Sequence, residues 1–410
     1  MPDPELAPTA PPPFAEDFRG TVLRVRGSFT ELLSAIGADA SRPQDIARTF
    51  GINRNLSWKL SRIVHSTDPA EVSSHLPGAS GLKILLATCA KHGASKVVCQ
   101  RVADSIADFD RMVATHAGSR SDLEVMLSSL EGNAATPARL QASRRQAFLG
   151  NSAIWGVQGH VRLATQIYVP SATTPGSVDA VTISGLLGFR RLRPDAIWPL
   201  VQHQFFRHDE EQSPLVSVPL DPEISPDQAP TLREWSTLDP DLLHAVTIPA
   251  GRSWELGAGP VGRTGTVDAV FGRITANIGP LAGTADSDHA WVFVKLNTPV
   301  ETLQSDLLVH RDLPLPGPPE VVVASGLEGG DDFDLDDLRG RVLPCPERLQ
   351  DLGEAPPALA SPMAPRYSSM ISSVLARIGH RPDDFRGWRL TMSHPPVPSR
   401  AALRIPLHVE

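Results

Sequence analysis

The sequence predicts an α+β protein, with an all-α domain at the N-terminus and a larger β-rich α+β region after it. Two observations support this fold class. Up to about residue 130, apolar residues recur at helical spacing, as in Val98, Val102, Ile106, Phe109 and Val113. Beyond Gly150 they alternate with a period of two, as in Val161, Leu163, Thr165, Ile167 and Val169. The regular strand and helix alternation of a doubly wound fold is missing.

Prolines indicate how the chain is divided. Its 410 residues exceed the usual size of a single core, and its 39 prolines fall in clusters. We expect a disordered proline-rich tail over residues 1–19 and a helical domain over 20–135. The β-rich α+β region follows over 150–410. Proline-rich linkers near 213–240 and 313–319 can divide this region into two subdomains.

Helix-start signals are frequent in the first third of the chain. Ser28 and Glu31 have the spacing of a capping box, which predicts that a short helix begins there. A long amphipathic helix is expected from Ser95 to His116. Together these signals predict several packed helices before the strand-rich region.

Residues 41–65 predict two helices joined by a tight turn. Ser41 and Gln44 form a capping box for the first helix. Gly51 can adopt the left-handed conformation that ends it, and Asn53 is a good N-cap for the second helix. The segment resembles the helix-turn-helix of bacterial transcriptional regulators, and the whole chain is similar to an uncharacterised bacterial family with this motif at its front. The resemblance implies DNA binding.

The second helix of this motif divides into two faces when it is wound at about 100° per residue. One face is an apolar stripe, formed by Leu56, Leu60, Ile63 and Val64. Basic and amide side chains lie opposite, where they can reach base edges or phosphates in a major groove. The residues that we assign to DNA contact are Arg42, Arg54, Asn55, Trp58, Lys59 and Arg62. For Trp58, packing against a neighbouring helix is the alternative.

The charge of the chain is unevenly distributed along the sequence. Its formal net charge is −8, which argues against indiscriminate binding to nucleic acid. Residues 41–118 contain ten Lys or Arg and six Asp or Glu, a net of +4, which leaves −12 for the rest. A local basic region of this kind is compatible with DNA binding by the helical domain.

We therefore expect a sequence-specific DNA-binding protein, a transcriptional regulator whose C-terminal region senses a ligand or mediates assembly. The expected partners are double-stranded DNA, a small-molecule effector and a second copy of the chain, because regulators commonly pair two such motifs in a homodimer. Two alternatives stay open. The β-rich region can be an enzyme of unknown reaction that carries a DNA-binding or adaptor domain, or the whole chain can serve as an interaction protein.

Other patterns that suggest chemistry fail on their context or spacing. Gly257–Gly262 matches G-x-G-x-x-G, but a strand follows it where dinucleotide binding requires a helix, so it indicates a turn between strands. Metal-capable side chains gather in residues 203–211, and His310 precedes Asp312, without a recognised ligand spacing. No nucleophile elbow or phosphate-binding loop occurs. We therefore expect no catalytic residue, no cofactor and no metal.

Composition also bears on where the protein acts. No apolar run approaches the roughly 20 residues of a membrane helix, and the first 19 residues lack a signal-peptide pattern. The three cysteines show no C-x-x-C spacing, which favours free thiols. We expect a cytoplasmic protein without membrane contact.

Overall fold

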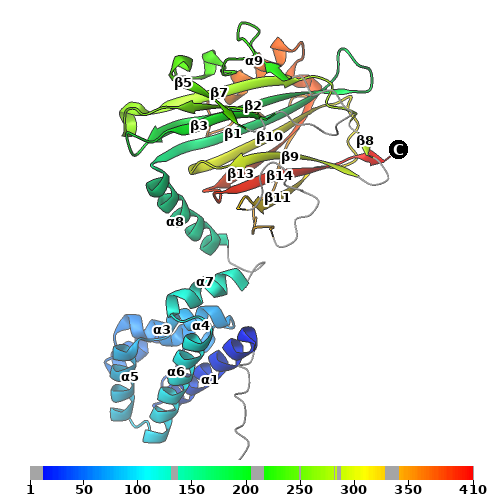
Figure 1. The fold of residues 1–410 in the computed structure, drawn as a ribbon. Helices are drawn as coiled ribbons and strands as arrows, with labels where there is room; N and C mark the ends of the chain where they lie inside the picture. Colours follow the sequence, from blue (N-terminus) through cyan, green and yellow to red (C-terminus); the bar gives the residue numbers. More distant parts are fainter. Residues whose placement is uncertain are drawn as a thin grey trace, which may run out of the picture. The chain divides into compact units, whose positions relative to one another are not determined.

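The computed structural model describes residues 13–130, 137–204, 217–248, 251–280, 282–283, 288–327 and 341–409. It has an α+β fold, in which helices at the N-terminus precede a sheet-rich part, as the sequence predicted (Figure 1). The chain divides into two compact units, Met1–Ala135 and Thr136–Glu410, which we call unit 1 and unit 2. Each unit buries hydrophobic clusters of its own.

Unit 1 is helical throughout its described part. Its helices are α1 (Phe14–Ala35), α2 (Pro43–Phe50), α3 (Arg54–His65), α4 (Pro69–His75), α5 (Ala79–Lys91), α6 (Lys96–His116) and α7 (Arg120–Leu130). Their apolar faces bury one cluster, because each helix is amphipathic and turns its apolar stripe inward. The two longest helices contribute Phe18, Val22, Val25, Phe29, Leu32 and Leu33 from α1, and Val102, Ile106, Phe109, Met112 and Val113 from α6.

Helix α1 corrects two expectations. The sequence assigned residues 1–19 to a disordered tail, but the helix begins at Phe14 because Phe18 packs into the core and is 6% exposed. Residues 1–12 lie outside the described ranges. Ser28 is not an N-cap: it lies within α1, where its hydroxyl donates to the Val25 carbonyl and lies 2.8 Å from the Ser105 hydroxyl of α6. A buried serine pair therefore joins α1 to α6.

Unit 2 begins with α8 (Pro137–Trp155) and is dominated by a seven-stranded sheet. The strands of this sheet are, in spatial order, β12 (Gln350–Glu354), β13 (Phe385–Ser393), β10 (Val300–His310), β1 (Val157–Pro170), β2 (Val178–Arg191), β7 (Val267–Thr275) and β4 (Ser217–Pro219). Strands β1 and β10 pair in parallel, and the other neighbours pair antiparallel.

Three smaller sheets complete the described part of unit 2. One has the order β11 (Glu320–Ser325), β14 (Ser399–Pro406) and β9 (His289–Leu296), and another the order β3 (Trp198–Gln204), β6 (Gly251–Leu256) and β5 (Leu243–Ile248). The third pairs β15 (His408–Val409) with β8 (Ala282–Gly283). Short 3₁₀ turns lie at η1 (Arg233–Trp235), η2 (Pro240–Leu242), η3 (Gly262–Gly265) and η4 (Pro382–Asp384).

The large sheet is covered on both faces, because side chains alternate between them along each strand. Helix α9 (Tyr367–Arg377) packs on one face, where Ile371 and Leu375 meet Leu163 of β1 and Ile183 of β2. The two three-stranded sheets pack on the other face, β9 and β14 over β10 and β13, and β3 and β6 over β2 and β7. Figure 1 shows α9 and the large sheet in unit 2.

A buried ion pair lies beneath α9. The Arg389 guanidinium of β13 binds both carboxylate oxygens of Asp306 on β10 at 2.7–3.1 Å. It also donates to the carbonyls of Leu359 and Ala360, so its charge and donors are satisfied. Burial lowers the pKa of Arg389, but the hydrogen bonds and charge of Asp306 outweigh it and raise that pKa. The two residues lie opposite each other in the register of β10 and β13.

The proline-rich segments do not separate two subdomains, contrary to expectation. Within the described part of 213–240, Leu220 and Leu232 pack on the same cluster as β1 and β2. In 313–319, Leu313 is buried against β10 and β13. These segments are connections that cover the sheet, since their apolar residues are held in its core.

In the described ranges, no helix has the length and apolarity that crossing a membrane requires.

Candidate functional site

The structure forms the helix, turn and helix that the sequence predicted at residues 41–65. Helix α2 ends at Gly51, whose φ of 68° is the left-handed conformation that glycine adopts without strain. Asn53 caps α3, and its side-chain oxygen accepts from the backbone N–H of Asn55 at 2.8 Å. Ile46 and Ile52 are 1% and 4% exposed, which anchors the turn in the core of unit 1.

The predicted rotation of α3 about its axis is also confirmed. Leu60 and Ile63 are fully buried, and Leu56 and Val64 are partly buried. On the opposite side, Arg54, Asn55, Trp58 and Arg62 are exposed, and Lys59 is partly buried. The assigned residues of α3 therefore lie away from the core, on what we call the outer face of α3.

Two of these residues contact helix α4. Trp58, which is 45% exposed, lies edge-on to the His75 ring at 5.0 Å, and the Arg62 guanidinium lies 5.4 Å from the centre of the indole. Arg62 also approaches Glu71 at 3.5 Å. Burial lowers the pKa of His75. The charges of Arg62 and Lys59 lower this pKa further, while the charge of Glu71 raises it. Trp58 therefore packs against α4 with part of its ring, as the alternative interpretation predicted, while the rest of the ring is exposed.

The remaining residues of the outer face have fewer partners. Arg54 and Lys59 make no hydrogen bond or ion pair with any described residue, and the same is true of the Asn55 side-chain amide. Arg42, at the start of α2, lies 3.7 Å from Asp39, with both side chains mostly exposed. Such an exposed pair exchanges partners at little cost.

Sequence reasoning missed His65, which is exposed at the last residue of α3. It follows Arg54 by eleven residues, which is about three helical turns, and so lies on the same side of the helix. Its ring nitrogen Nδ1 lies 3.0 Å from the Ser61 carbonyl. The helical spacing carries this signal, and the predicted end of the motif at residue 65 already made it available from the sequence.

The charge of unit 1 is smaller than the sequence window suggested. Over Met1–Ala135 there are 14 Lys or Arg and 15 Asp or Glu, a net of 14 − 15 = −1. The value of +4 for residues 41–118 excludes acids that belong to the same unit, including Asp17 and Glu31 of α1. Glu31 pairs with Arg101, and Asp17 lies 3.1 Å from the Nε2 atom of His116. Any electrostatic attraction to DNA must therefore come from the local distribution of charge.

Other sequence patterns are resolved by their surroundings. Gly257–Gly262 lies between β6 and β7, which confirms the predicted turn between strands. Gly259 lies so close to Arg191 that an added Cβ would be 3.1 Å from its guanidinium, which explains one glycine of the pattern by packing. Most of the metal-capable cluster at 203–211 lies outside the described residues.

His310 does gather further polar groups around it. Candidate ligand atoms of His310, His380 and Asp384 lie within 4.8 Å of one another. Both oxygens of Asp384 are already in use, because Oδ2 accepts from the Arg381 N–H at 2.8 Å and Oδ1 from Arg311 at 3.2 Å. A metal ion here would face the Arg311 charge, so we assign none to this cluster. Burial and the neighbouring His310 lower the pKa of His380, while the charge of Asp384 raises it.

The chain was compared with protein families, curated proteins and solved structures. No family model matches the chain, and no curated protein matches it. One solved structure, a putative protease from Parabacteroides distasonis, aligns with 8% identity and a TM-score of 0.27. The alignment covers 61% of this chain and 40% of that one, so the chain spans less than half the length of that protein. At this TM-score the likeness carries no argument about fold or function.

Proposed function

We propose that this protein binds double-stranded DNA through the outer face of α3 and acts as a sequence-specific transcriptional regulator. The observation that carries the proposal is the pairing of a capped helix-turn-helix with an outward row of Arg54, Asn55 and Lys59 that has no partner among the described residues. A helix in this setting can enter the major groove, which is wide enough to admit it.

Each residue type on this face suits a different part of the duplex. Arg54 can donate to the O6 and N7 atoms of guanine, and Asn55 can bind adenine through its amide. Arg42, Lys59 and Arg62 are cations that can neutralise phosphates. Arg62 is held over Trp58 and near Glu71, so it would have to leave Glu71 to bind a phosphate.

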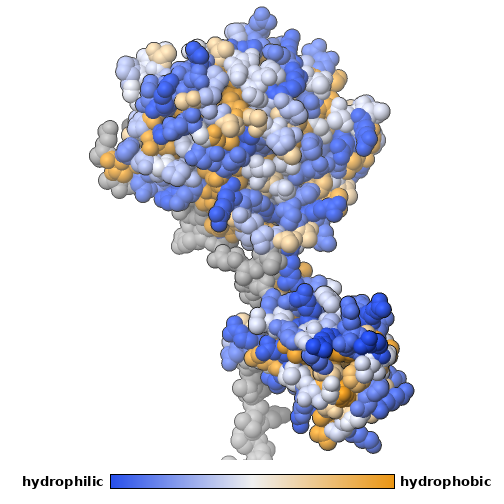
Figure 2. All heavy atoms as spheres, turned by 180° about the vertical axis from the view of Figure 1, so that it is seen from behind, coloured by the Kyte–Doolittle hydropathy of each residue, from blue (hydrophilic) through white to orange (hydrophobic). Residues whose placement is uncertain are grey.

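We further propose that the chain works as a homodimer and that unit 2 senses a ligand or mediates assembly. A single helix-turn-helix reads one half-site, and two copies gain affinity by binding half-sites one DNA turn apart. Two exposed apolar residues, Leu23 on α1 and Val97 on α6, are 52% and 66% exposed and support a contact between copies along these helices. Figure 2 shows apolar residues interspersed with hydrophilic ones on the visible face of unit 1.

Binding can be tested with the full chain and a pool of random duplex DNA. Repeated selection followed by sequencing yields a preferred site, whose affinity is then measured by fluorescence anisotropy. Arg54→Ala and Asn55→Ala should each weaken binding by about 1–3 kcal/mol at that site, because each removes a contact to a base edge. Arg111→Ala, on the exposed surface of α6, is the matched control and should leave affinity unchanged.

Thermal unfolding separates a lost contact from a lost fold. Both α3 variants should keep the melting temperature of the parent chain, because Arg54 and Asn55 contribute no side chain to the core. A pool that shows no enrichment after selection, or variants that bind like the parent, would remove DNA recognition by α3 from the account.

A further inference from the structure

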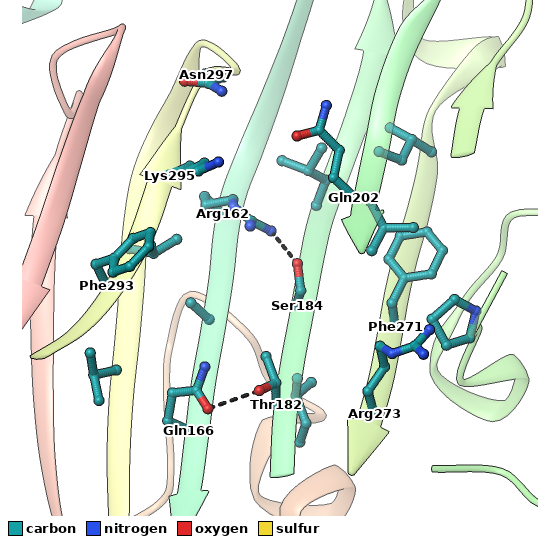
Figure 3. A pocket seen from close by; sticks show the side chains of 18 of the residues that line it. Arg162, Gln166, Thr182, Ser184, Gln202, Phe271, Arg273, Phe293, Lys295 and Asn297 are labelled. Carbon is teal, nitrogen blue, oxygen red and sulfur yellow. Dashed lines mark hydrogen bonds between the residues drawn. The ribbon is translucent and has the colours of Figure 1, made fainter. Parts of the chain in front are cut away.

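Unit 2 contains a cavity of about 430 Å³ on the face of the large sheet opposite α9. Strands β1, β2 and β7 form its floor, and its walls come from β3 and β9, each the edge strand of its own small sheet (Figure 3). At one end the Trp198 indole donates to the Thr298 hydroxyl at 2.8 Å, which joins the two walls. The cavity is therefore a gap between two small sheets, lined by residues of β1, β2, β3, β4, β7 and β9.

The register of the floor strands places the side chains that line the cavity in rows across the sheet. Ala164 of β1 pairs with Ser184 of β2, which pairs with Phe271 of β7, and the next row holds Gln166, Thr182 and Arg273. Arg162 lies one row before Ala164, opposite Leu186 of β2. Rows on one face are about 7 Å apart and strands about 5 Å. The Thr182 hydroxyl donates to the Gln166 side-chain oxygen at 2.9 Å, so these two polar groups in the middle of the floor are hydrogen-bonded to each other.

Arg162 is a half-buried cation on the floor of this cavity. All its hydrogen bonds use one nitrogen, Nη1, which donates to the Ser184 hydroxyl at 2.7 Å and to the carbonyls of Gly185 and Leu163. Within the described chain its Nε and Nη2 atoms have no partner. Burial lowers the pKa of Arg162 to about 10, so the side chain is still charged at neutral pH.

Two further cations line the same cavity. Arg273 donates to the hydroxyl and carbonyl of Ser217, while its buried Nη1 atom has no hydrogen-bond partner among the described residues. Burial lowers its pKa to about 10 as well. Lys295, which is the sole lysine of residues 136–410, extends from β9 into the part of the cavity that holds Arg162 (Figure 3).

The balance of charge in the cavity is unusual for its surroundings. Unit 2 carries 24 Lys or Arg and 31 Asp or Glu, a net of 24 − 31 = −7, yet the described residues that line the cavity include three cations and no acid. Buried charges in proteins are normally paired, because leaving water without a counter-charge is costly. Of the buried arginines, Arg191 donates to backbone carbonyls, while Arg389 and Arg144 each have a carboxylate partner, in Asp306 and Glu347. Neither Arg162 nor Arg273 has one within the described residues.

We infer that this cavity binds a small organic anion, whose carboxylate or phosphate group lies against Arg162 and whose apolar part packs between Phe271 and Phe293. Both rings line the cavity next to the cations, on β7 and β9 (Figure 3). The volume is in the range of small-molecule sites, which combine apolar walls with a few polar anchors. The inference deepens the ligand-sensing part of the proposed function, and binding measured without DNA keeps its failure distinct from a failure of DNA recognition.

The test uses the full chain and three probes that share one aromatic frame. Isothermal titration compares 2-naphthoate, 2-naphthyl phosphate and the neutral 2-naphthamide. At least one anion should bind about tenfold or more tightly than the amide, because a charge-assisted hydrogen bond is worth about 1.5–3 kcal/mol. Comparison of the two anions shows whether a carboxylate or a phosphate is preferred.

Variants assign the preference to Arg162. Arg162→Met should reduce the anion to the affinity of the amide, while Arg348→Met, at an exposed position outside the cavity, should change nothing. If Arg162→Met does not fold, Arg162→Lys should retain the preference for the anion and Arg273→Met should reduce it. Failure of both anions to bind in the millimolar range, equal binding of anion and amide, or a preference that survives loss of Arg162 would each overturn the inference.

Discussion

The buried pair Asp306–Arg389 gives a sharp test of how unit 2 is held together. Its side chains are 0% and 6% exposed, and the carboxylate receives three hydrogen bonds from the guanidinium. Asp306→Ala leaves a buried guanidinium that keeps the Leu359 and Ala360 carbonyls and the Tyr367 ring at 5.2 Å, but no counter-charge among the described residues. Breaking such a pair on one side costs about 3–5 kcal/mol, because the remaining charge stays buried without its counter-charge.

This cost is large enough to read in thermal unfolding. With about 2–4 °C per kcal/mol for large domains, Asp306→Ala should lower the melting temperature of unit 2 by about 6–20 °C. The matched control is Asp288→Ala, whose partner Arg404 lies 3.3 Å away with both side chains well exposed, and which should cost about 1 kcal/mol or less. The double variant Asp306→Leu with Arg389→Met should recover most of the loss, because it removes both charges. Equal shifts for Asp306→Ala and Asp288→Ala would refute the reasoning.

Three further predictions concern the rest of the molecule. Asn53→Ala should destabilise unit 1 by about 0.5–2 kcal/mol in chemical denaturation, since it removes the cap of α3, and an unchanged midpoint would contradict that role. The full chain should sediment as a dimer with its selected DNA site, and a monomer with and without DNA would remove the homodimer proposal. The free energy of unfolding should fall as pH drops below about 6.5, because His75, His380 and His394 have lowered pKa values when folded and the unfolded chain takes up protons first. Replacing His380 with Gln should reduce that slope, and a slope that stays the same would exclude His380 as a contributor.

Local signals predicted the helix-turn-helix well because each of these residues acts on the backbone within two residues of its own position. Gly51 supplies a left-handed turn, and Asn53 caps the helix that follows, whatever surrounds them. The apolar stripe of α3 fixes which side faces the core. The same local reasoning failed at Ser28, because the helix had already begun at Phe14 and the serine was needed to meet Ser105. The capping box predicted at Ser41 and Gln44 does not form either, because Arg42 is the N-cap of α2 and the Ser41 hydroxyl donates to Asp39 at 2.7 Å. The spacing of a capping box therefore does not by itself fix the first residue of a helix.

Longer-range features were not accessible from the sequence. Strand β3 contains Pro199, and β6 is short and begins with glycine, so neither shows a clear alternating pattern. The cavity depends on Arg162, Arg273 and Lys295, which lie far apart in the chain and meet only through the pairing of β1, β2 and β7 and the position of β9. The contact of Trp58 with His75 depends in the same way on where α4 packs. Sheet order and helix packing are set by tertiary contacts that spacing does not encode.

The central claim, that α3 binds duplex DNA, is tested most directly by the salt dependence of binding. The full chain is titrated against its selected duplex over a range of salt concentrations, and the logarithm of the binding constant is plotted against that of the salt. With Arg42, Lys59 and Arg62 neutralising phosphates, the slope should be about −2.7 for one copy and about −5 for a dimer, and Lys59→Ala should reduce its magnitude. No binding at low salt, or a slope near zero, would contradict the account.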